Sequence, residues 1–284
     1  MAIGCKTTSL DSLRKNLQDY TNGVDATVGI AVITSGGDTL TVNNGVHYPM
    51  MSVFKFHQAL GVSAFLAEKQ LPLDTKIEVR SSDLQTDTWS PLRDKYPDGG
   101  VEITVAEALG YTLQQSDNLV CDMLFDRFVD TDGVEAFIKR QGVEGVAIRY
   151  NEVDMYGDHM LSYANWSTPY AAALLLDKFI DGKVIGEPYY DCIRDLMLGC
   201  ETGVNRLARP FEGSGYKLGH KTGSGYVDAA GRLMACNDIG FVLSPEGKKA
   251  YVIAVFVRDS GLTEKETEDI IATVSSMVKE ALLE

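Results

Sequence analysis

The sequence predicts an α+β fold, an α/β sandwich in which an antiparallel sheet is flanked by N- and C-terminal helices and joined to an all-helical subdomain. Three observations support this prediction. Apolar residues have helical spacing near both ends of the chain, and strand-like runs occur both before residue 43 and after Ser214. Between about Val105 and Phe179, the pattern is mostly helical and rich in Ala, Leu and acidic residues.

The N-terminal part is predicted to form a helix and a hairpin. Apolar residues recur at helical spacing between Leu10 and Tyr20, and Asn22-Gly23 is a typical helix end. The runs 28–33 and 39–42 then flank a short turn rich in glycine, as in a β-hairpin.

The C-terminal part is predicted to complete the same sheet. Four runs have strand character, namely 216–218, 231–235, 239–243 and 250–257. A capping box of Thr263 and Glu266 then begins a final helix with an apolar stripe.

This element order predicts one domain of residues 1–284, built from an α/β subdomain (1–48 plus 210–284) and a mostly helical subdomain (49–209). A cleft between the two subdomains is the expected ligand site.

Composition favours a small-molecule ligand. The chain has 26 Lys+Arg and 40 Asp+Glu, a net charge of −14, so it lacks a basic surface for nucleic acid. Its five cysteines form no C-x-x-C pair, so neither a metal site nor a disulfide is predicted, and Cys121 and Cys236 are expected to be buried. No apolar run approaches the roughly 20 residues that span a bilayer, and the residues before Cys5 do not resemble a signal peptide.

A serine and a lysine lie one helical turn apart after Pro49. Because residues three apart share a helix face, a helix that begins near Ser52 places the Lys55 amine beside the Ser52 hydroxyl, as a nucleophile and its base. The free N–H groups of a helix N-terminus can also hold an oxyanion. By itself the pattern is more often a helix-capping serine and a solvated lysine.

Two further polar segments accompany this pair. Ser116-Asp117-Asn118 lies between helical stretches and is by itself typical of a cap or turn. Lys221-Thr222-Gly223 follows a predicted edge strand, and its glycine allows a backbone or ligand to approach closely. In this order and these contexts, the three motifs are those of class A β-lactamases and penicillin-binding proteins. The sequence resembles a class A serine β-lactamase over nearly its whole length, which implies the β-lactamase/transpeptidase-like fold.

The resemblance implies a glutamate on an omega loop that holds the water for deacylation. Glu152 lies at the matching place; the alternative is an exposed loop carboxylate. The usual loop has Pro after this glutamate and an Arg–Asp ion pair between its ends, whereas this chain has Val153, Tyr150 and Asn165 there. A cis Glu152–Val153 bond would cost about 2.5–4 kcal/mol, so a trans bond is expected. The loop resembles a branch of class A with an enlarged omega loop, several of whose members favour cephalosporins.

The resemblance also suggests residues of the binding cleft. Trp89 matches an aromatic residue at the cleft mouth, and Arg206 matches an arginine beside the Lys-Thr-Gly strand that helps to hold the substrate carboxylate. Apart from the resemblance, Trp89 would be a core or interface residue and Arg206 a surface residue. His57 and His220 match no catalytic role and are expected to be structural.

The implied activity is hydrolysis of β-lactams, cephalosporins and penicillins, through an acyl-enzyme on Ser52. Lys55 or Glu152 would take the serine proton, Ser116 would pass a proton to the leaving nitrogen, and Glu152 would activate the hydrolytic water. The backbone N–H groups of Ser52 and Ser224 would hold the oxyanion. The expected substrate-binding residues are Asn118, Lys221, Thr222, Gly223, Ser224, Trp89 and Arg206. No metal or organic cofactor is implied.

Two alternatives stay open at this point. A penicillin-binding DD-peptidase would form a long-lived acyl-enzyme without turnover, and a non-hydrolytic β-lactam-binding or peptidoglycan-binding protein would form no adduct at Ser52. The resemblance implies a periplasmic or exported protein, with Ala2-Ile3-Gly4-Cys5 as a candidate remnant of a lipid-attachment site. We expect a monomer that binds a small β-lactam, with no nucleic acid partner and no transmembrane segment.

Overall fold

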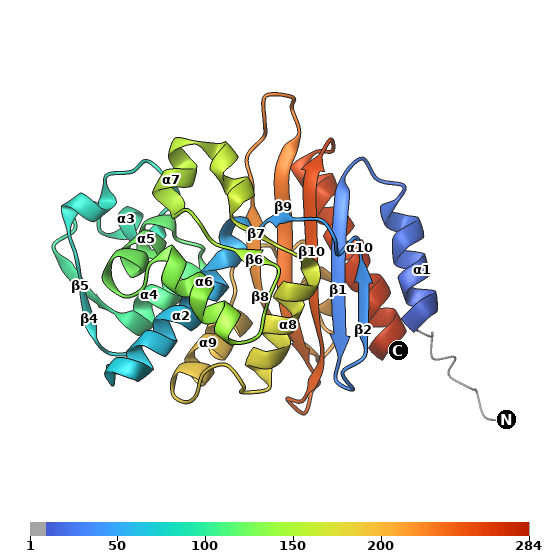
Figure 1. The fold of residues 1–284 in the computed structure, drawn as a ribbon, viewed down its shortest axis with the longest axis horizontal. Coiled ribbons are helices and arrows are strands. Elements are labelled where there is room, and N and C mark those ends of the chain that lie inside the picture. The colour runs from blue at the N-terminus through green and yellow to red at the C-terminus, as the bar shows by residue number, and fades with distance from the viewer. Residues whose placement is uncertain (1–9, 284) are drawn as a thin grey trace.

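The fold centres on a five-stranded antiparallel sheet with the strand order β2-β1-β10-β9-β8 (Figure 1). The computed structural model describes residues 10–283. The strands are β1 (Thr27–Thr34), β2 (Thr39–Val42), β8 (Lys217–Ser224), β9 (Leu233–Leu243) and β10 (Lys249–Ser260). Because β1 pairs with β10 along its whole length, the two ends of the chain share one sheet, which confirms the predicted α+β architecture.

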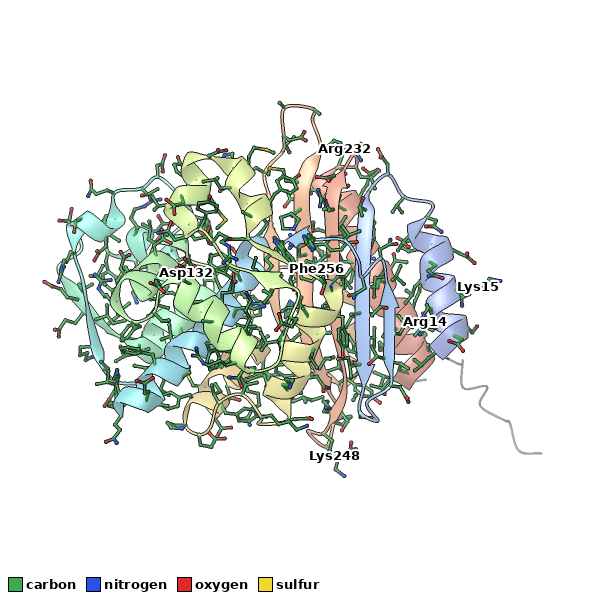
Figure 2. The ribbon with its side chains drawn as sticks, in the orientation of Figure 1. Arg14, Lys15, Asp132, Arg232, Lys248 and Phe256 are labelled. Atoms are coloured by element: carbon green, nitrogen blue, oxygen red, sulfur yellow. The ribbon has the colours of Figure 1, made fainter. Side chains whose placement is uncertain are left out.

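Helices from both termini cover one face of this sheet. They are α1 (Leu10–Thr21) and α10 (Glu264–Leu283), which lie side by side in Figure 1. Side chains alternate between the two faces of a strand, so Val255 of β10 packs on these helices while Phe256 packs on the opposite side. Figure 2 shows Phe256 inside the molecule and Lys15 on the outer side of α1.

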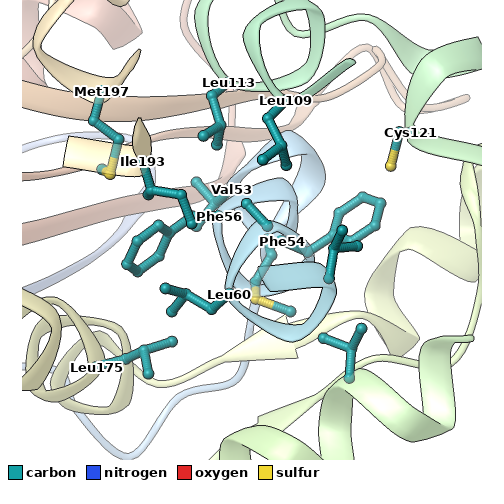
Figure 3. Packing of buried hydrophobic residues seen from close by; sticks show 14 of the residues in the cluster. Val53, Phe54, Phe56, Leu60, Leu109, Leu113, Cys121, Leu175, Ile193 and Met197 are labelled. Carbon is teal, nitrogen blue, oxygen red and sulfur yellow. The ribbon is translucent and has the colours of Figure 1, made fainter. Parts of the chain in front are cut away.

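The other face of the sheet packs on α8 (Pro169–Ile180), and further helices surround α2 (Phe54–Lys69). Residues 54–63 of α2 are all buried. Figure 3 shows Phe56 and Leu60 of this helix packed among Leu109, Leu113, Leu175, Ile193 and Met197. Because residues 54–63 are enclosed, the turn that begins α2 has a well-defined position relative to the sheet.

Local capping signals explain where several helices begin. The side chains of Asp117, Asp130 and Thr168 each accept a hydrogen bond from the N–H group three residues on, and Thr104 forms a capping box with Glu107.

The other helical elements are η1 (Met51–Val53), η2 (Ser81–Leu84), α3 (Pro91–Lys95), α4 (Val105–Gln114), α5 (Asn118–Arg127), α6 (Thr131–Arg140), α7 (Glu152–Gly157), η3 (His159–Ala164), α9 (Tyr189–Leu198) and η4 (Arg209–Phe211).

The middle of the chain, predicted to be mostly helical, also takes part in two small sheets. β4 (Lys76–Val79) pairs with β5 (Val101–Thr104), and β7 (Trp166–Ser167) lies between β3 (Tyr48–Pro49) and β6 (Val146–Ala147). Strands of two residues are too short to produce a periodic sequence signal. The pairings of β7 with β3 and β6 therefore escaped sequence analysis, and the four-residue strands β4 and β5 were also not predicted.

The predicted runs 231–235 and 239–243 form one strand, β9, and not two. Asn237 and Asp238 interrupt the apolar pattern between them, but both are fully buried and hydrogen-bonded to distant parts of the chain. A local pattern cannot reveal such partners. The division into subdomains 1–48 plus 210–284 and 49–209 stays a prediction.

Candidate active site

Ser52 lies in η1, the single turn between β3 and α2. The preceding residue, Met51, has a left-handed backbone with φ 48°, a conformation that costs a non-glycine residue roughly 1 kcal/mol or more. Buried Asn237 holds this turn, because its Nδ2 donates to the carbonyl oxygens of Pro49 and Met50 at 2.8 and 3.1 Å. The strained turn is thus tied to β9, and sequence analysis did not find Asn237.

The Lys55 amine lies at the centre of the site. Its Nζ donates to Ser52 Oγ at 3.0 Å, to the Ser116 carbonyl oxygen at 2.8 Å and to Asn118 Oδ1 at 2.5 Å. It also forms an ion pair with Glu152, with 2.9 Å between Nζ and Oε1. The Lys55 side chain is fully buried, so the carboxylate of Glu152 balances a charge that would otherwise be costly to bury.

The segment between α4 and α5 presents Ser116 and Asn118 to this amine. Ser116 has a left-handed backbone with φ 60°. Asp117, which is fully buried, caps α5 and accepts hydrogen bonds from Val120 N–H, Leu92 N–H and Ser90 Oγ at 2.8 to 2.9 Å. Because Asp117 points away from the site, its two neighbours point into it.

Strand β8 supplies Lys221, whose Nζ donates to Ser116 Oγ at 3.0 Å. Burial, and then the nearby charge of Lys55, lower the pKa of Lys221 to about 7. Gly223 lets β8 approach the nucleophile turn closely, since a Cβ atom there would lie 2.4 Å from the Met50 carbonyl oxygen. The glycine of the Lys-Thr-Gly motif thus brings Ser224 towards Ser52.

Glu152 is the first residue of α7, and its side chain is almost completely buried. Asp122 of α5 fixes the first turn of α7. Its two carboxylate oxygens accept hydrogen bonds from the backbone N–H groups of Glu152 and Val153, each at 2.8 Å. Burial, and then the charge of Glu152, raise the pKa of Asp122 to about 7. Sequence analysis missed Asp122; its position four residues after Asn118, on the same helix face, was the available signal.

An amide replaces the usual ion pair between the ends of the omega loop. Asn165 Oδ1 accepts hydrogen bonds from the backbone N–H groups of Arg149 and Tyr150, at 2.7 and 3.0 Å. Its Nδ2 donates to the Tyr150 carbonyl oxygen at 2.7 Å. Asn165 is thus the closing residue, as predicted. The cis peptide bond found in residues 10–283 is Glu187–Pro188, so the Glu152–Val153 bond is trans, also as predicted.

Asp122→Asn is expected to loosen α7 and slow turnover. The oxygen of the asparagine amide can accept a hydrogen bond from one of the two backbone N–H groups, of Glu152 or Val153. The asparagine NH₂ group would face the other N–H, and two donors cannot form a hydrogen bond. We expect the free energy of unfolding to fall by about 1–3 kcal/mol, with a lower kcat. Urea unfolding and steady-state kinetics measure both quantities.

Asp126→Asn is the matched control, because Asp126 lies one turn further along α5 and is exposed. It should change neither quantity. Wild-type stability and kcat in Asp122→Asn would show that Asp122 does not position Glu152.

These elements enclose a cavity of about 450 Å³. The predicted residues that line it are Ser52, Trp89, Ser116, Asn118, Arg206, Thr222 and Ser224. Lys55 and Lys221 lie directly behind this lining, in contact with Ser52 and Ser116, and Glu152 pairs with Lys55. Tyr156 of α7 and Tyr226, after β8, also line the cavity, and sequence analysis did not find them.

Trp89 and Arg206 border the cavity in different ways. The Trp89 side chain is exposed at the rim, and its Nε1 donates to the Gln115 carbonyl oxygen at 2.9 Å. Arg206 is buried, pairs with Glu268 at 2.9 Å and donates to Ser224 Oγ at 2.7 Å. Arg206 therefore fixes the end of β8 and adds a positive charge beside it.

The two motif-flanking histidines are both buried and outside the cavity lining. Burial lowers the pKa of His57 to about 4, and its Nδ1 lies 3.4 Å from the Val53 carbonyl oxygen. His220 Nδ1 lies 2.9 Å from Asp238 Oδ1. Neither ring contacts Ser52 in the described structure, in agreement with the structural roles expected for them.

Comparisons with known proteins agree with this geometry. The chain matches the model of the beta-lactamase enzyme family over residues 12–282. It is 37% identical over 275 residues to a beta-lactamase of Bacteroides uniformis, covering 96% of this chain and 92% of that protein. It is 33% identical to beta-lactamase VEB-1 of Pseudomonas aeruginosa, covering 94% of this chain and 89% of that one.

Solved structures are similar as well. The crystal structure of TLA-3 extended-spectrum beta-lactamase superposes with a TM-score of 0.94 at 38% identity, covering 97% of this chain and 100% of that chain. A class A beta-lactamase from Bacteroides cellulosilyticus gives a TM-score of 0.89 at 36% identity, covering 95% and 96%.

Proposed function

The chain belongs to the class A β-lactamase family and hydrolyses β-lactams through a serine acyl-enzyme, and we propose that Ser52 is the serine that forms it. The position of the Lys55 amine carries this proposal. The amine contacts the Ser52 hydroxyl on one side and the Glu152 carboxylate on the other, at 3.0 and 2.9 Å. A hydroxyl next to a base that is itself oriented by a third group has the arrangement of an activated nucleophile.

In acylation, Ser52 Oγ attacks the β-lactam carbonyl carbon, and its proton passes to Lys55 or Glu152. The oxyanion accepts hydrogen bonds from the backbone N–H groups of Ser52 and Ser224. The C–N bond of the ring then breaks. Ser116, which contacts the Lys221 amine at 3.0 Å, delivers a proton to the leaving nitrogen.

The far end of the cavity binds the substrate carboxylate. Lys221, Thr222, Ser224 and Arg206 donate charge-assisted or neutral hydrogen bonds to it, and the backbone of Gly223 completes this wall. Asn118 orients the substrate side-chain amide, and Trp89 covers the cleft mouth. These contacts place the carbonyl carbon beside Ser52.

In deacylation, Glu152 removes a proton from a water molecule that attacks the acyl carbon. The first turn of α7 positions the Glu152 carboxylate, since Asp122 accepts hydrogen bonds from the backbone N–H groups of Glu152 and Val153. Ser52 is then released with its proton restored. The capacity for this second step distinguishes a hydrolase from a penicillin-binding DD-peptidase.

Steady-state hydrolysis of a chromogenic cephalosporin by the wild type and by Ser52→Ala tests the proposal. Turnover by the wild type and none by the variant is the expected result, and an active variant would overturn it. We propose cephalosporins and penicillins as substrates of a monomeric, exported enzyme. Among the described residues, none of the helices is both long and apolar enough to cross a membrane. The candidate lipid-attachment remnant, residues 2–5, lies outside the described residues.

The kcat/KM for an anionic cephalosporin is expected to fall as the pH rises above about 7. The pKa of Lys221 is lowered to about 7, so the amine is a cation below this pH and loses its charge above it. Because kcat/KM reports the free enzyme, the loss of this cation weakens capture of the substrate carboxylate. A bound carboxylate stabilises the protonated amine, so kcat should depend less on pH. Steady-state rates across the pH range measure both profiles.

Lys221→Arg provides the comparison, because a guanidinium stays protonated throughout this range. In this variant the fall of kcat/KM at alkaline pH, the alkaline limb of the pH profile, should begin at a higher pH than in the wild type. This holds even if the variant's kcat/KM is lower overall. An alkaline limb at the same pH in both proteins would assign that limb to another group.

A further inference from the structure

A cysteine, a histidine and an aspartate lie together behind the wall of the cavity. Cys200 follows α9, while His220 and Asp238 lie on the paired strands β8 and β9. His220 Nδ1 lies 2.9 and 3.0 Å from the two carboxylate oxygens of Asp238, and both side chains are buried. Burial opposes a charge on His220, but Asp238 outweighs it and raises the pKa of His220 to about 10.

The Cys200 thiol lies beside this histidine, and the two side chains shift each other's pKa. A cysteine, an imidazole and an orienting carboxylate form the arrangement that activates thiol nucleophiles. Burial opposes ionisation of Cys200, but His220 and Lys221 outweigh it, so the pKa of the thiol is lowered.

The other described cysteines have the opposite character. Burial raises the pKa of Cys192, which lies on α9 and is also partly exposed. Cys121 and Cys236 are buried, as predicted, and burial raises the pKa of each thiol. Of the thiols in residues 10–283, Cys200 is therefore the one that combines partial exposure with a lowered pKa.

Cys200 is connected to the substrate side of the wall through two threonines. Its Sγ lies 3.4 Å from Thr202 Oγ1, which lies 2.6 Å from Thr222 Oγ1. Thr202 and Thr222 both line the cavity. A negative charge on Cys200 raises the pKa of Lys221, so ionisation of the thiol favours the protonated amine. A change at Cys200 thus reaches the proposed carboxylate-binding residues through both geometry and charge.

We propose that Cys200 is a thiol-modification site at which a small disulfide controls binding of the substrate carboxylate. The thiolate sulfur attacks one sulfur of the disulfide, a new S–S bond to Cys200 forms, the original S–S bond breaks, and the other half leaves as a thiolate. The disulfide is the oxidant, so no other reactant is needed. The added group disturbs the Thr202–Thr222 contact, and the modified sulfur can no longer ionise. Reduction by a thiol reverses the change.

The test uses 2,2′-dipyridyl disulfide with the full chain at about pH 6, where low-pKa thiols react selectively. Because Cys5 lies outside the described residues, the experiment starts from Cys5→Ser and compares it with Cys5→Ser combined with Cys200→Ser or with Cys192→Ser. We expect release of one pyridinethione per chain and a mixed disulfide that peptide mapping places at Cys200. Cys5→Ser combined with Cys192→Ser should release the same amount of pyridinethione as Cys5→Ser alone. Cys5→Ser combined with Cys200→Ser should release none.

The effect on turnover rests on the proposed roles of Lys221 and Thr222, whereas the labelling does not. After labelling, kcat/KM for the cephalosporin should fall about tenfold, mainly through KM, as expected for one weakened charged hydrogen bond. The alkaline limb of kcat/KM should move to lower pH, and dithiothreitol should restore both. A purely structural disturbance would not move that limb.

Two results would overturn the inference: preferential labelling of Cys192, or labelling of Cys200 with unchanged KM and pH profile. If the unlabelled protein did not hydrolyse the cephalosporin, the proposed function would fail, but peptide mapping would still decide which thiol reacts. Should Cys200→Ser fail to fold, as circular dichroism would show, reversal of the wild-type label by dithiothreitol keeps the test decisive.

Discussion

Ser52→Ala is expected to lower kcat/KM for a chromogenic cephalosporin by roughly 10⁴-fold or more, as removal of a catalytic nucleophile does in other acyl-transfer enzymes. The variant lacks the oxygen that forms the acyl bond, and among the described residues Ser52 Oγ, at 3.0 Å, is the hydroxyl that accepts a hydrogen bond from the Lys55 amine. The fold should persist, because the substitution removes one hydrogen bond from a turn that Asn237 holds independently. Initial rates and thermal unfolding measure the two effects.

Ser63→Ala is the matched control. Ser63 lies on the same helix as Lys55, is fully buried, and its hydroxyl has no hydrogen-bond partner among the described residues. Its removal should leave kcat/KM unchanged. Mass spectrometry adds a second readout, since a β-lactam adduct should form on the wild type and be absent from Ser52→Ala. Turnover or an adduct in Ser52→Ala would assign the nucleophile to another residue.

Glu152→Gln is expected to accumulate the acyl-enzyme. The glutamine keeps the shape of the side chain, but its amide cannot take a proton from the hydrolytic water, so kcat should fall by about 10²–10⁴-fold. Pre-steady-state hydrolysis should show a burst equal to the enzyme concentration, followed by slow turnover. Mass spectrometry of the quenched reaction should detect the adduct on Ser52.

The substitution also removes the negative charge that pairs with Lys55 at 2.9 Å, so acylation itself can become slower. The burst and the adduct separate the two effects, because slow acylation alone gives neither. Asp154→Asn is the matched control, since Asp154 is exposed on the same helix. Unchanged steady-state turnover in Glu152→Gln would remove Glu152 from the mechanism.

Several contacts of the site were predictable because they form within one helical turn. Ser52 and Lys55 are three residues apart, so their contact follows from helix geometry. Asp117 caps α5 through the N–H of Val120, also three residues away. The missing Pro and ion pair of the omega loop likewise predicted a trans bond after Glu152 and a closing role for Asn165.

Other contacts could not be read from a local pattern, because their partners are far apart along the chain, and only the resemblance placed Lys221 and Ser116 in one cleft. Lys221 and Ser116 are separated by 105 residues, and Asp122 and Glu152 by 30. Asn237 reaches back 188 residues to Pro49. Each depends on how strands and helices pack, and a pattern read over one or two turns carries no information on such packing.

The amino-acid sequence by itself determined the α+β class, the approximate positions of the terminal helices and of the sheet strands, and the chemical groups available for acyl transfer. Periodicity, capping and residue spacing act over a few residues, so they can be read directly. Only the tertiary structure decided that Asp122 holds the start of α7, that Asn237 holds the nucleophile turn, and that Cys200 lies behind the cavity wall against His220. The pairing of β8 with β9 and the enclosure of α2 create these contacts, and both depend on the whole chain folding together.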